Sequence, residues 1–350
     1  MTTQDPTSAA MQRWHDLFNR ANGRRRVFCV YGGDEPLPPI PNAEAFPENK
    51  TGRIENAWQN YRQMLDRRSW IGDDSIPFAD VYTGTEIFAH AFGCGVYRHE
   101  NSNPSARPLI TRASQVALLK VPSLDCPPLA VLFEIGDELR RRGGADLIMK
   151  IPDIQSPVDI AALIWNKTDF YYAMIDAPEA VHELATKCRQ LLTAFCDEWF
   201  SRYGRAFIAH YPPYYMPQGL TLSEDEIGCV NREMAEEFFL PHLNALSDHF
   251  GGLGIHCCAN ARHQWDTFLK IRNLRVLNIT QGPAVTADAY RFFNEKVIHV
   301  HDGQPDGADM PAWIDANAPA APVLLREVAA TREEAIEKCA RLREWADGKW

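Results

Sequence analysis

The sequence predicts a (β/α)8 barrel that forms a single domain behind a short N-terminal extension. Eight short apolar runs alternate with helix-like segments along 350 residues, a length that accommodates one large barrel. Each run is almost continuously apolar, as strands are in a parallel sheet that is covered on both faces. An open doubly wound sheet is the alternative, but no GxGxxG or GxxxxGK[ST] pattern supports it. Residues 1–26 are the expected extension and residues 27–350 the expected barrel.

The expected strands are short apolar runs bounded by turn-forming or polar residues. They span residues 27–31, 78–82, 146–150, 206–210, 253–257, 275–279, 297–301 and 322–326. Helices are expected between them, at residues 54–68, 128–142, 178–202 and 232–250. Gly143 and Gly251 each follow one of these helices, and glycine commonly follows a helix C-terminus. Thr331 and Glu334 form a capping-box pattern for the last helix.

The composition excludes several kinds of partner. The formal net charge is -10, and the two dense basic runs, Arg24–Arg26 and Arg140–Arg142, are too short to make a basic face for nucleic acid. No segment approaches the roughly 20 apolar residues that a membrane helix needs, and the polar N-terminus lacks an apolar signal core. The nine cysteines include no CxxC pair. We therefore expect a cytoplasmic protein with reduced thiols and a small-molecule substrate.

Polar side chains gather at the carboxyl ends of the expected strands, where barrel enzymes carry their active sites. The candidate catalytic residues are His301, Asp302, Asp153 and His210. The candidate substrate-binding residues are Tyr31, Tyr82, Tyr211, Tyr214, Gln281 and Asn260. Aromatic residues in the loop after residue 210 suit stacking on a flat substrate or a corrinoid, and simple loop packing is the alternative.

A metal site is predicted at the end of the fifth strand. His256 and Cys258 are two residues apart, so both side chains point to the same side of an extended chain. Imidazole and thiolate together favour zinc. A core cysteine beside a hydrogen-bonded histidine is the alternative interpretation. Catalytic zinc needs about three protein ligands, and the third is open among Glu327, His301 and His299.

Several segments resemble the uroporphyrinogen decarboxylase superfamily. They are Leu222–Ile227, Glu233–Leu243, Phe250–Asn260, Arg275–Gln281 and Asp73–Pro77. The third of these carries the sequence HCCAN, which is similar to an H-x-C-G-N strand end of the family, with Ala259 in the glycine position. The resemblance covers most of the chain after residue 50, is strongest between residues 220 and 282, and implies a (β/α)8 barrel.

The resemblance is closer to the methylcobamide:thiol methyltransferases than to true uroporphyrinogen decarboxylases. The decarboxylases carry an arginine-rich motif after the first strand, where this chain has Tyr31-Gly32-Gly33-Asp34. The methyltransferases hold zinc with an H-x-C pair, which His256 and Cys258 match, and with a further cysteine near the last strand. Glu327 stands near that last position here.

The resemblance therefore implies a zinc-dependent methyltransferase. Such an enzyme moves a methyl group between a methylcobamide, carried by a partner corrinoid protein, and a thiol or similar acceptor. The alternatives are a metal-free decarboxylase or other lyase acting on a carboxylated substrate, and a binding barrel without catalysis. Dimerisation is common in the family, so a homodimer is a further expectation.

Overall fold

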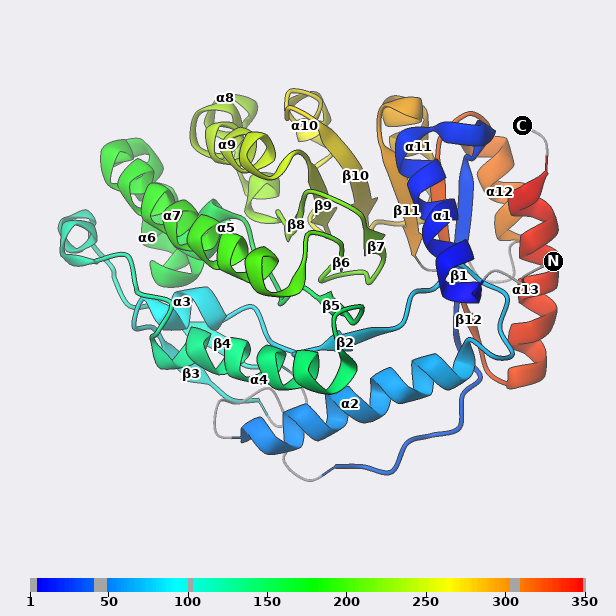
Figure 1. Cartoon of the computed structure of the whole chain (residues 1–350). Coiled ribbons are helices and arrows are strands. Elements are labelled where there is room, and N and C mark those ends of the chain that lie inside the picture. Colours follow the sequence, from blue (N-terminus) through cyan, green and yellow to red (C-terminus); the bar gives the residue numbers. More distant parts are fainter. Residues whose placement is uncertain (1–4, 41–48, 100–102, 303–308, 349–350) are drawn as a thin grey trace.

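Two hydrogen-bonded arcs of strands form the barrel in the computed structural model, which describes residues 5–40, 49–99, 103–302 and 309–348 (Figure 1). The first arc has the order β1-β12-β11-β10-β9-β8, and the second has the order β2-β5-β6-β7. The strands of the first arc are β1 (Arg26–Gly32), β8 (Leu220–Ser223), β9 (Leu253–Cys257), β10 (Leu274–Ile279), β11 (Ile298–Asp302) and β12 (Val323–Ala329). The second arc contains β2 (Phe78–Asp80), β5 (Ile148–Lys150), β6 (Phe207–Ile208) and β7 (Tyr215–Met216). A separate hairpin pairs β3 (Gly95–Tyr97) with β4 (Ser105–Arg107).

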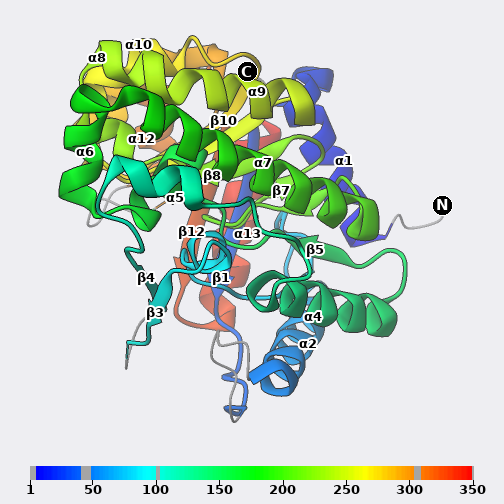
Figure 2. The same ribbon diagram turned by 90° about the vertical axis from the view of Figure 1, so that its left-hand side faces the viewer.

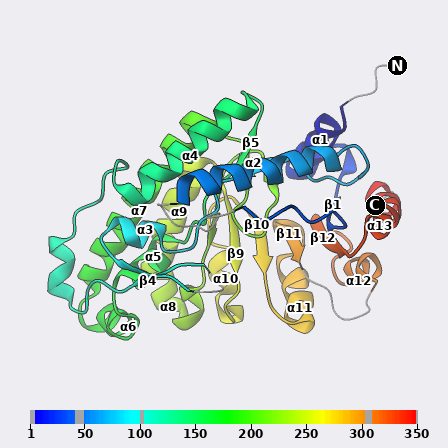
Figure 3. The ribbon, with the colours of Figure 1, turned by 90° about the horizontal axis from the view of Figure 1, so that it is seen from below.

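Helices surround the strands, as expected for a barrel of this class (Figures 1 and 2). The longer ones are α1 (Pro6–Asn19), α2 (Lys50–Arg67), α4 (Pro127–Gly143), α7 (Pro178–Tyr203), α9 (Leu240–Phe250), α11 (Pro283–Phe293) and α13 (Arg332–Asp347). The shorter ones are α3 (Ile87–Ala91), α5 (Pro157–Ile164), α6 (Lys167–Asp176), α8 (Arg232–Met234), α10 (Trp265–Phe268) and α12 (Met310–Asn317). Helices α1 and α13 both lie beside β1 (Figure 3). No helix in the described ranges combines the length and apolarity needed to cross a membrane.

Alternating side chains of β1 face two different apolar clusters. Val27 and Cys29 belong to the main core with Leu324 of β12, whereas Phe28 and Val30 pack with residues of α12 and α13. All four β1 side chains are nearly or fully buried. Burying each such side chain stabilises the fold by about 1.5–3 kcal/mol. The period of two therefore places odd-numbered residues of β1 toward the barrel interior.

Two aspartates, instead of a strand, lie along the free edge of β1. The Phe28 amide donates to Oδ2 of Asp74 at 3.0 Å, and the Val30 amide donates to Oδ2 of Asp73 at 3.0 Å. Both carboxylates are fully buried. Asp74 is paired with Arg343 at 2.7 Å and also with Arg13, and Asp73 is paired with Arg68 at 2.8 Å. The Asp74 amide also donates to the Phe28 backbone oxygen at 2.9 Å. Two carboxylates and one main-chain hydrogen bond, in place of a ladder, thus close the junction between β1 and β2, which we call the seam.

The fourth position of the barrel differs from the prediction. The expected strand at residues 206–210 is only the two-residue β6, which pairs with β5 and turns back antiparallel to β7. The strand beside β9 is β8, which the sequence analysis did not identify. A bridge between Gln155 and Ser223 joins the two arcs on this side. The segment between β6 and β8 therefore contributes β7 to the sheet of the second arc.

The helix expected at residues 232–250 is continuous but irregular. A π-helical turn at Ala235–Phe239 separates α8 from α9. Pro241 follows it and has no N–H to donate to the preceding turn. Gly251 ends the helix with φ 86°, as predicted from its position.

Candidate active site at the barrel mouth

His256 lies near the carboxyl end of β9 with its ring orientation fixed by a neighbouring strand. Its Nδ1 is 2.6 Å from Oδ1 of Asn278 on β10, and Nδ2 of Asn278 donates to the backbone oxygen of Val300 at 2.9 Å. A backbone oxygen only accepts, so the Asn278 nitrogen must face Val300 and its oxygen must face His256. Nδ1 of His256 is therefore the protonated nitrogen. In the neutral ring, Nε2 keeps its lone pair for a ligand.

The mouth residues around His256 come from three loops. The ring of Tyr211, which is 49% exposed, meets the His256 ring edge-on at a centroid distance of 4.9 Å. Cys258 is exposed, and its backbone oxygen accepts a hydrogen bond from Nε2 of Gln281 at 2.6 Å. Asn260 is also exposed on this loop. The structure thus brings Tyr211, Gln281 and the His256–Cys258 segment to one end of the barrel.

An acidic turn holds the loop that carries Cys258. Oδ1 of Asp225 accepts from the amides of Cys258 at 2.7 Å and Ala259 at 3.3 Å. Asp159 of α5 accepts in turn from the amides of Asp225 and Glu226. Burial, with the adjacent Asp225 carboxylate, raises the pKa of the Cys258 thiol to about 11. The free thiol is consequently protonated at neutral pH.

Asp159 and Glu224 form a pair of buried carboxyl groups beneath this turn. Burial raises the pKa of Asp159 to about 7, and burial together with Asp159 raises the pKa of Glu224 well above its usual range. Two adjacent carboxyl groups in an apolar environment do not both ionise readily. The Glu224 amide donates to the backbone oxygen of His256 at 2.9 Å. The acid pair therefore supports the strand end that carries His256.

Inside the barrel, His210 and Asp153 lie within electrostatic reach of His256. His210 is buried and its ring nitrogens contact the hydroxyls of Ser223 at 2.9 Å and Thr221 at 3.3 Å. Burial, and then the nearby His256, lower the pKa of His210 well below its usual value. Burial raises the pKa of Asp153, although a hydrogen bond from Gln155 opposes the shift. Both predicted catalytic residues thus face the interior near His256.

Three candidate ligands or catalytic residues lie outside this interior. Glu327 is buried on the outer face of β12, where it pairs with Arg341 at 3.3 Å and Lys338 at 3.6 Å of α13. His301 lies on the outer face of β11, with Nδ1 2.7 Å from the hydroxyl of Tyr290 on α11. Its neighbour two residues earlier, His299, contacts the same tyrosine ring.

These positions correct two expectations. Glu327 does not reach His256 and Cys258 as a third metal ligand, and His301 does not lie in the mouth as a catalytic group. Within the described ranges, no three His, Cys, Asp or Glu side chains gather closely enough to hold a metal ion. Imidazole and thiol are donor types that suit zinc, so His256 and Cys258 have the chemistry of two zinc ligands, whereas the predicted third ligand lies elsewhere.

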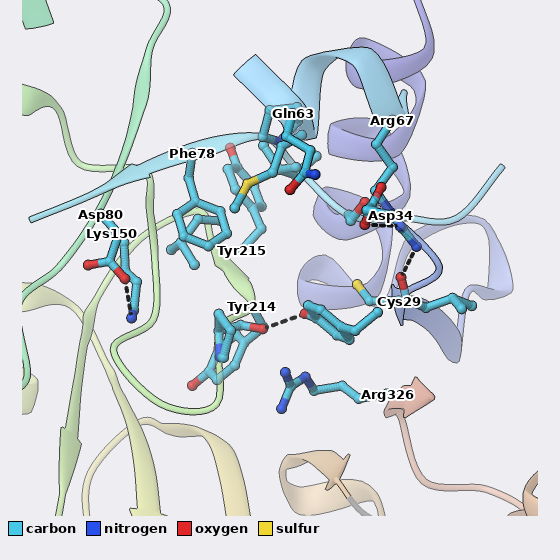
Figure 4. A pocket seen from close by; sticks show the side chains of 18 of the residues that line it. Cys29, Asp34, Gln63, Arg67, Phe78, Asp80, Lys150, Tyr214, Tyr215 and Arg326 are labelled. Atoms are coloured by element: carbon cyan, nitrogen blue, oxygen red, sulfur yellow. Dashed lines mark hydrogen bonds and ion pairs between the residues drawn. The ribbon is translucent and has the colours of Figure 1, made fainter. Parts of the chain in front are cut away.

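A cavity of about 330 Å³ opens beside the seam (Figure 4). It is lined by residues of both arcs, among them Tyr31 of β1, Lys150 of β5 and Tyr214 of the loop after β6. The hydroxyl of Tyr31 donates to the backbone oxygen of Pro213 at 3.1 Å. The predicted substrate-binding residues Tyr31 and Tyr214 therefore belong to this cavity.

The remaining predicted residues lie at its edges or on the surface. Asp302 forms an ion pair with Arg326 at 2.8 Å, and the Arg326 guanidinium stacks over the Tyr31 ring at 4.3 Å. Tyr82 is 42% exposed and has φ 41°. Its hydroxyl contacts the side chain of Asn103, which is not one of the residues around His256.

The sequence analysis gave no role to Asn278, Lys150 or Cys29. Asn278 and Arg326 are each a polar residue within a largely apolar strand, and this pattern is the sequence signal that could have marked them as functional. Their partners depend on strand register, which the sequence does not reveal.

Comparisons with known proteins agree with this architecture. The family model described as uroporphyrinogen decarboxylase (URO-D) matches residues 71–299. A methyltransferase from Methanosarcina mazei has a similar structure, with a TM-score of 0.63 and 12% sequence identity, over 97% of this chain and 98% of the other. At this identity the likeness shows the fold. No curated protein matches the sequence.

Proposed function

The chain belongs to the uroporphyrinogen decarboxylase family, and we propose that it is a methyltransferase of that family. It would move a methyl group between a corrinoid carried by a partner protein and a thiol or similar acceptor. The methyltransferase with a similar fold supports this proposal at the level of architecture. The absence of an arginine-rich motif after β1, where the chain has Tyr31-Gly32-Gly33-Asp34, disfavours a substrate with several carboxylates.

The observation that carries the proposal is the fixed tautomer of His256. Its Nδ1 proton is held by Asn278, so Nε2 presents a lone pair at the mouth. Metal-bound histidines almost always donate their other ring nitrogen to a carbonyl, carboxylate or water in this way. Cys258, which is exposed directly after the end of β9, would supply a thiolate as the second donor.

Zinc is part of the proposal, with His256 and Cys258 as two of its ligands. Zinc would supply a thiolate acceptor at neutral pH. The third ligand is not among the side chains predicted for it, so the proposal assigns the third position to none of them. Exposed Tyr211 beside His256 would border the approach of a corrinoid.

Adjacent cysteines provide a matched test of zinc binding. Cys258 is exposed at the mouth, whereas Cys257 is buried on the opposite side of the strand. In protein purified without chelators, we expect about one equivalent of zinc, loss of zinc in Cys258→Ala, and retention in Cys257→Ala. Methyl transfer from methylcobalamin to 2-mercaptoethanol should follow the same order. Wild-type protein without zinc, or equal zinc in both variants, would contradict the proposal.

A metal-free lyase is a second candidate, because a proton donor lies next to Asp153. Burial raises the pKa of Glu86 to about 7, and Asp153 is among the charges that raise it. An acid with a pKa near 7 is suited to proton transfer at neutral pH. For this candidate, lyase activity should survive in Cys258→Ala and be lost in Glu86→Gln. Methyl transfer, by contrast, should be lost in Cys258→Ala.

A further inference from the structure

The cavity at the seam is enclosed by two walls that belong to different arcs of the barrel. One wall comes from β1, β12 and helix α2, and the other from β2, β5 and the loop between β6 and β7. No main-chain ladder joins β1 to β2 among the described strands, so the interior extends sideways toward α2. At about 330 Å³, the volume is at the small end of ligand sites, which span roughly 300–1,000 Å³.

The cations at the cavity are each neutralised by an aspartate. Lys150 pairs with Asp80 at 2.6 Å and Arg67 pairs with Asp34 (Figure 4). Arg326 pairs with Asp302 at 2.8 Å. A carboxylated ligand would have to displace one of these aspartates or remain unpaired in a largely apolar space. Burying an unpaired charge is costly. The charge balance therefore favours an uncharged ligand.

Aromatic rings make up much of the lining. Trp14 of α1, Phe78 of β2 and Tyr215 of β7 line the cavity together with Tyr31 and Tyr214. Figure 4 shows the rings of Phe78, Tyr214 and Tyr215 around the same space. Rings of this kind favour offset or edge-on contacts with another aromatic ring, which stabilise a complex beyond the burial of area alone.

One buried polar donor of a cavity-lining residue lacks a partner. The Nε atom of Arg326 has no hydrogen-bond partner in the part of the chain that the structure describes, although the guanidinium is otherwise paired with Asp302. A buried N–H without an acceptor destabilises the folded protein. A ligand oxygen would relieve that cost, and it need not be charged to do so.

We propose that this cavity binds an uncharged single-ring aromatic compound that carries one oxygen acceptor, such as a phenol or an aryl ether. The volume limits the ligand to about one ring, the paired aspartates select against carboxylates, and Arg326 selects for an oxygen. The loop that lines the cavity with Tyr214 also places Tyr211 on His256, so the ligand lies at the same side of the barrel as the mouth. The assignment concerns binding alone and does not depend on methyl transfer.

Calorimetry with phenol and benzoate tests the assignment without zinc or a corrinoid. We expect saturable phenol binding at one site and binding of benzoate at least about tenfold weaker, a difference of about 1.4 kcal/mol. Benzoate binding as tight as that of phenol, or no saturable phenol binding, would overturn the proposal. Neither result would bear on the zinc content that tests the proposed function.

Neighbouring residues of α2 provide the matched variants. Met64 lines the cavity, whereas Leu65 is 44% exposed and does not. Met64→Trp should fill the space and weaken phenol binding about tenfold or more, and Leu65→Trp should leave it unchanged. Melting curves establish that both variants fold, and Met64→Phe replaces Met64→Trp if the larger ring unfolds the protein. Unchanged phenol affinity in the folded Met64 variant would place the ligand elsewhere and refute the assignment.

Discussion

Asn278 Oδ1 lies 2.6 Å from His256 Nδ1, and this contact joins β10 to the ring that defines the barrel mouth. The amide orientation is fixed from the other side by the backbone oxygen of Val300. The two contacts together determine which nitrogen of His256 carries the proton. Because Nε2 is then the nitrogen that faces a ligand, the protonation pattern of one residue is set by two neighbouring strands.

Replacing Asn278 by Leu should release this tautomer. We expect the nitrogen NMR signals of His256 to change from a single Nδ1-protonated form to a mixture, because the acceptor is gone. Loss of such a partner typically lowers metal affinity about 10–100-fold, so zinc retention should fall as well. Thr280→Val is the control, since the Thr280 hydroxyl contacts Asn278 at 3.3 Å but does not contact His256. A variant that keeps a pure Nδ1-protonated ring would disprove the role assigned to Asn278.

Replacing Asp74 by Ala should strongly destabilise the fold. The change removes the acceptor for the Phe28 amide and leaves Arg13 and Arg343 without their shared carboxylate. Breaking a buried ion pair from one side costs about 3–5 kcal/mol, which urea denaturation measures. Asp266→Ala removes a half-exposed partner of Arg232 and should cost less than about 1 kcal/mol. Equal losses in the two variants would show that the seam contributes no special stability.

Glu86 should make stability depend on pH. Its pKa rises from 4.5 to about 7 in the folded protein because of burial. The folded state therefore binds this proton more tightly than the unfolded state, and the free energy of unfolding falls as pH rises from 4.5 to 7. The expected loss is about 3 kcal/mol at 1.36 kcal/mol for each pKa unit.

The Glu86→Gln variant isolates this contribution. Glutamine does not ionise, so the variant should gain stability relative to the wild type across the same pH range, as followed by urea denaturation at several pH values. Glu134→Gln, at a half-exposed surface position, should follow the wild-type profile. Parallel wild-type and Glu86→Gln profiles would show that Glu86 ionises normally.

Glu327→Gln tests the corrected position of that side chain. The variant loses the charge that pairs with Lys338 and Arg341, so we expect a loss of about 1–2 kcal/mol in thermal or urea unfolding. Zinc content should equal that of the wild type, because Glu327 faces α13. Glu337→Gln, on the exposed side of α13, should change stability by less than about 0.5 kcal/mol. Loss of zinc from Glu327→Gln would show that Glu327 is a metal ligand and would contradict its assigned position.

The strand β9 could be predicted from the sequence to the residue. Gly251 ends the preceding helix, and the apolar run from Leu253 to Cys257 is followed by exposed polar residues. The fourth barrel position could not be predicted, since residues 206–210 form the more apolar run, whereas residues 220–223 read Leu-Thr-Leu-Ser and alternate apolar with polar residues. Which one pairs with β9 depends on tertiary contacts such as the bridge from Gln155 to Ser223.

The direction in which strand residues point was the other unpredictable feature. A period of two places His299 and His301 on one face of β11 but does not say which face. In a barrel strand both faces are buried, and here Ile298 and Val300 on the other face are as apolar as any core residues. The same ambiguity applies to Arg326 and Glu327 on β12, of which Arg326 is the one that lines the cavity.

At the seam, the interactions that hold neighbouring strands together differ from those at the junctions within the first arc. Adjacent strands of the first arc are held by ladders of main-chain hydrogen bonds, whereas β1 is joined to the segment before β2 by two carboxylates with their arginines and by one main-chain hydrogen bond, from the Asp74 amide to the Phe28 oxygen. Widening the cavity at this junction would break these few ionic contacts and one main-chain hydrogen bond and would leave every ladder intact. The cavity beside this junction and the opening at His256 are lined by different side chains, so a ligand in one need not obstruct a ligand in the other.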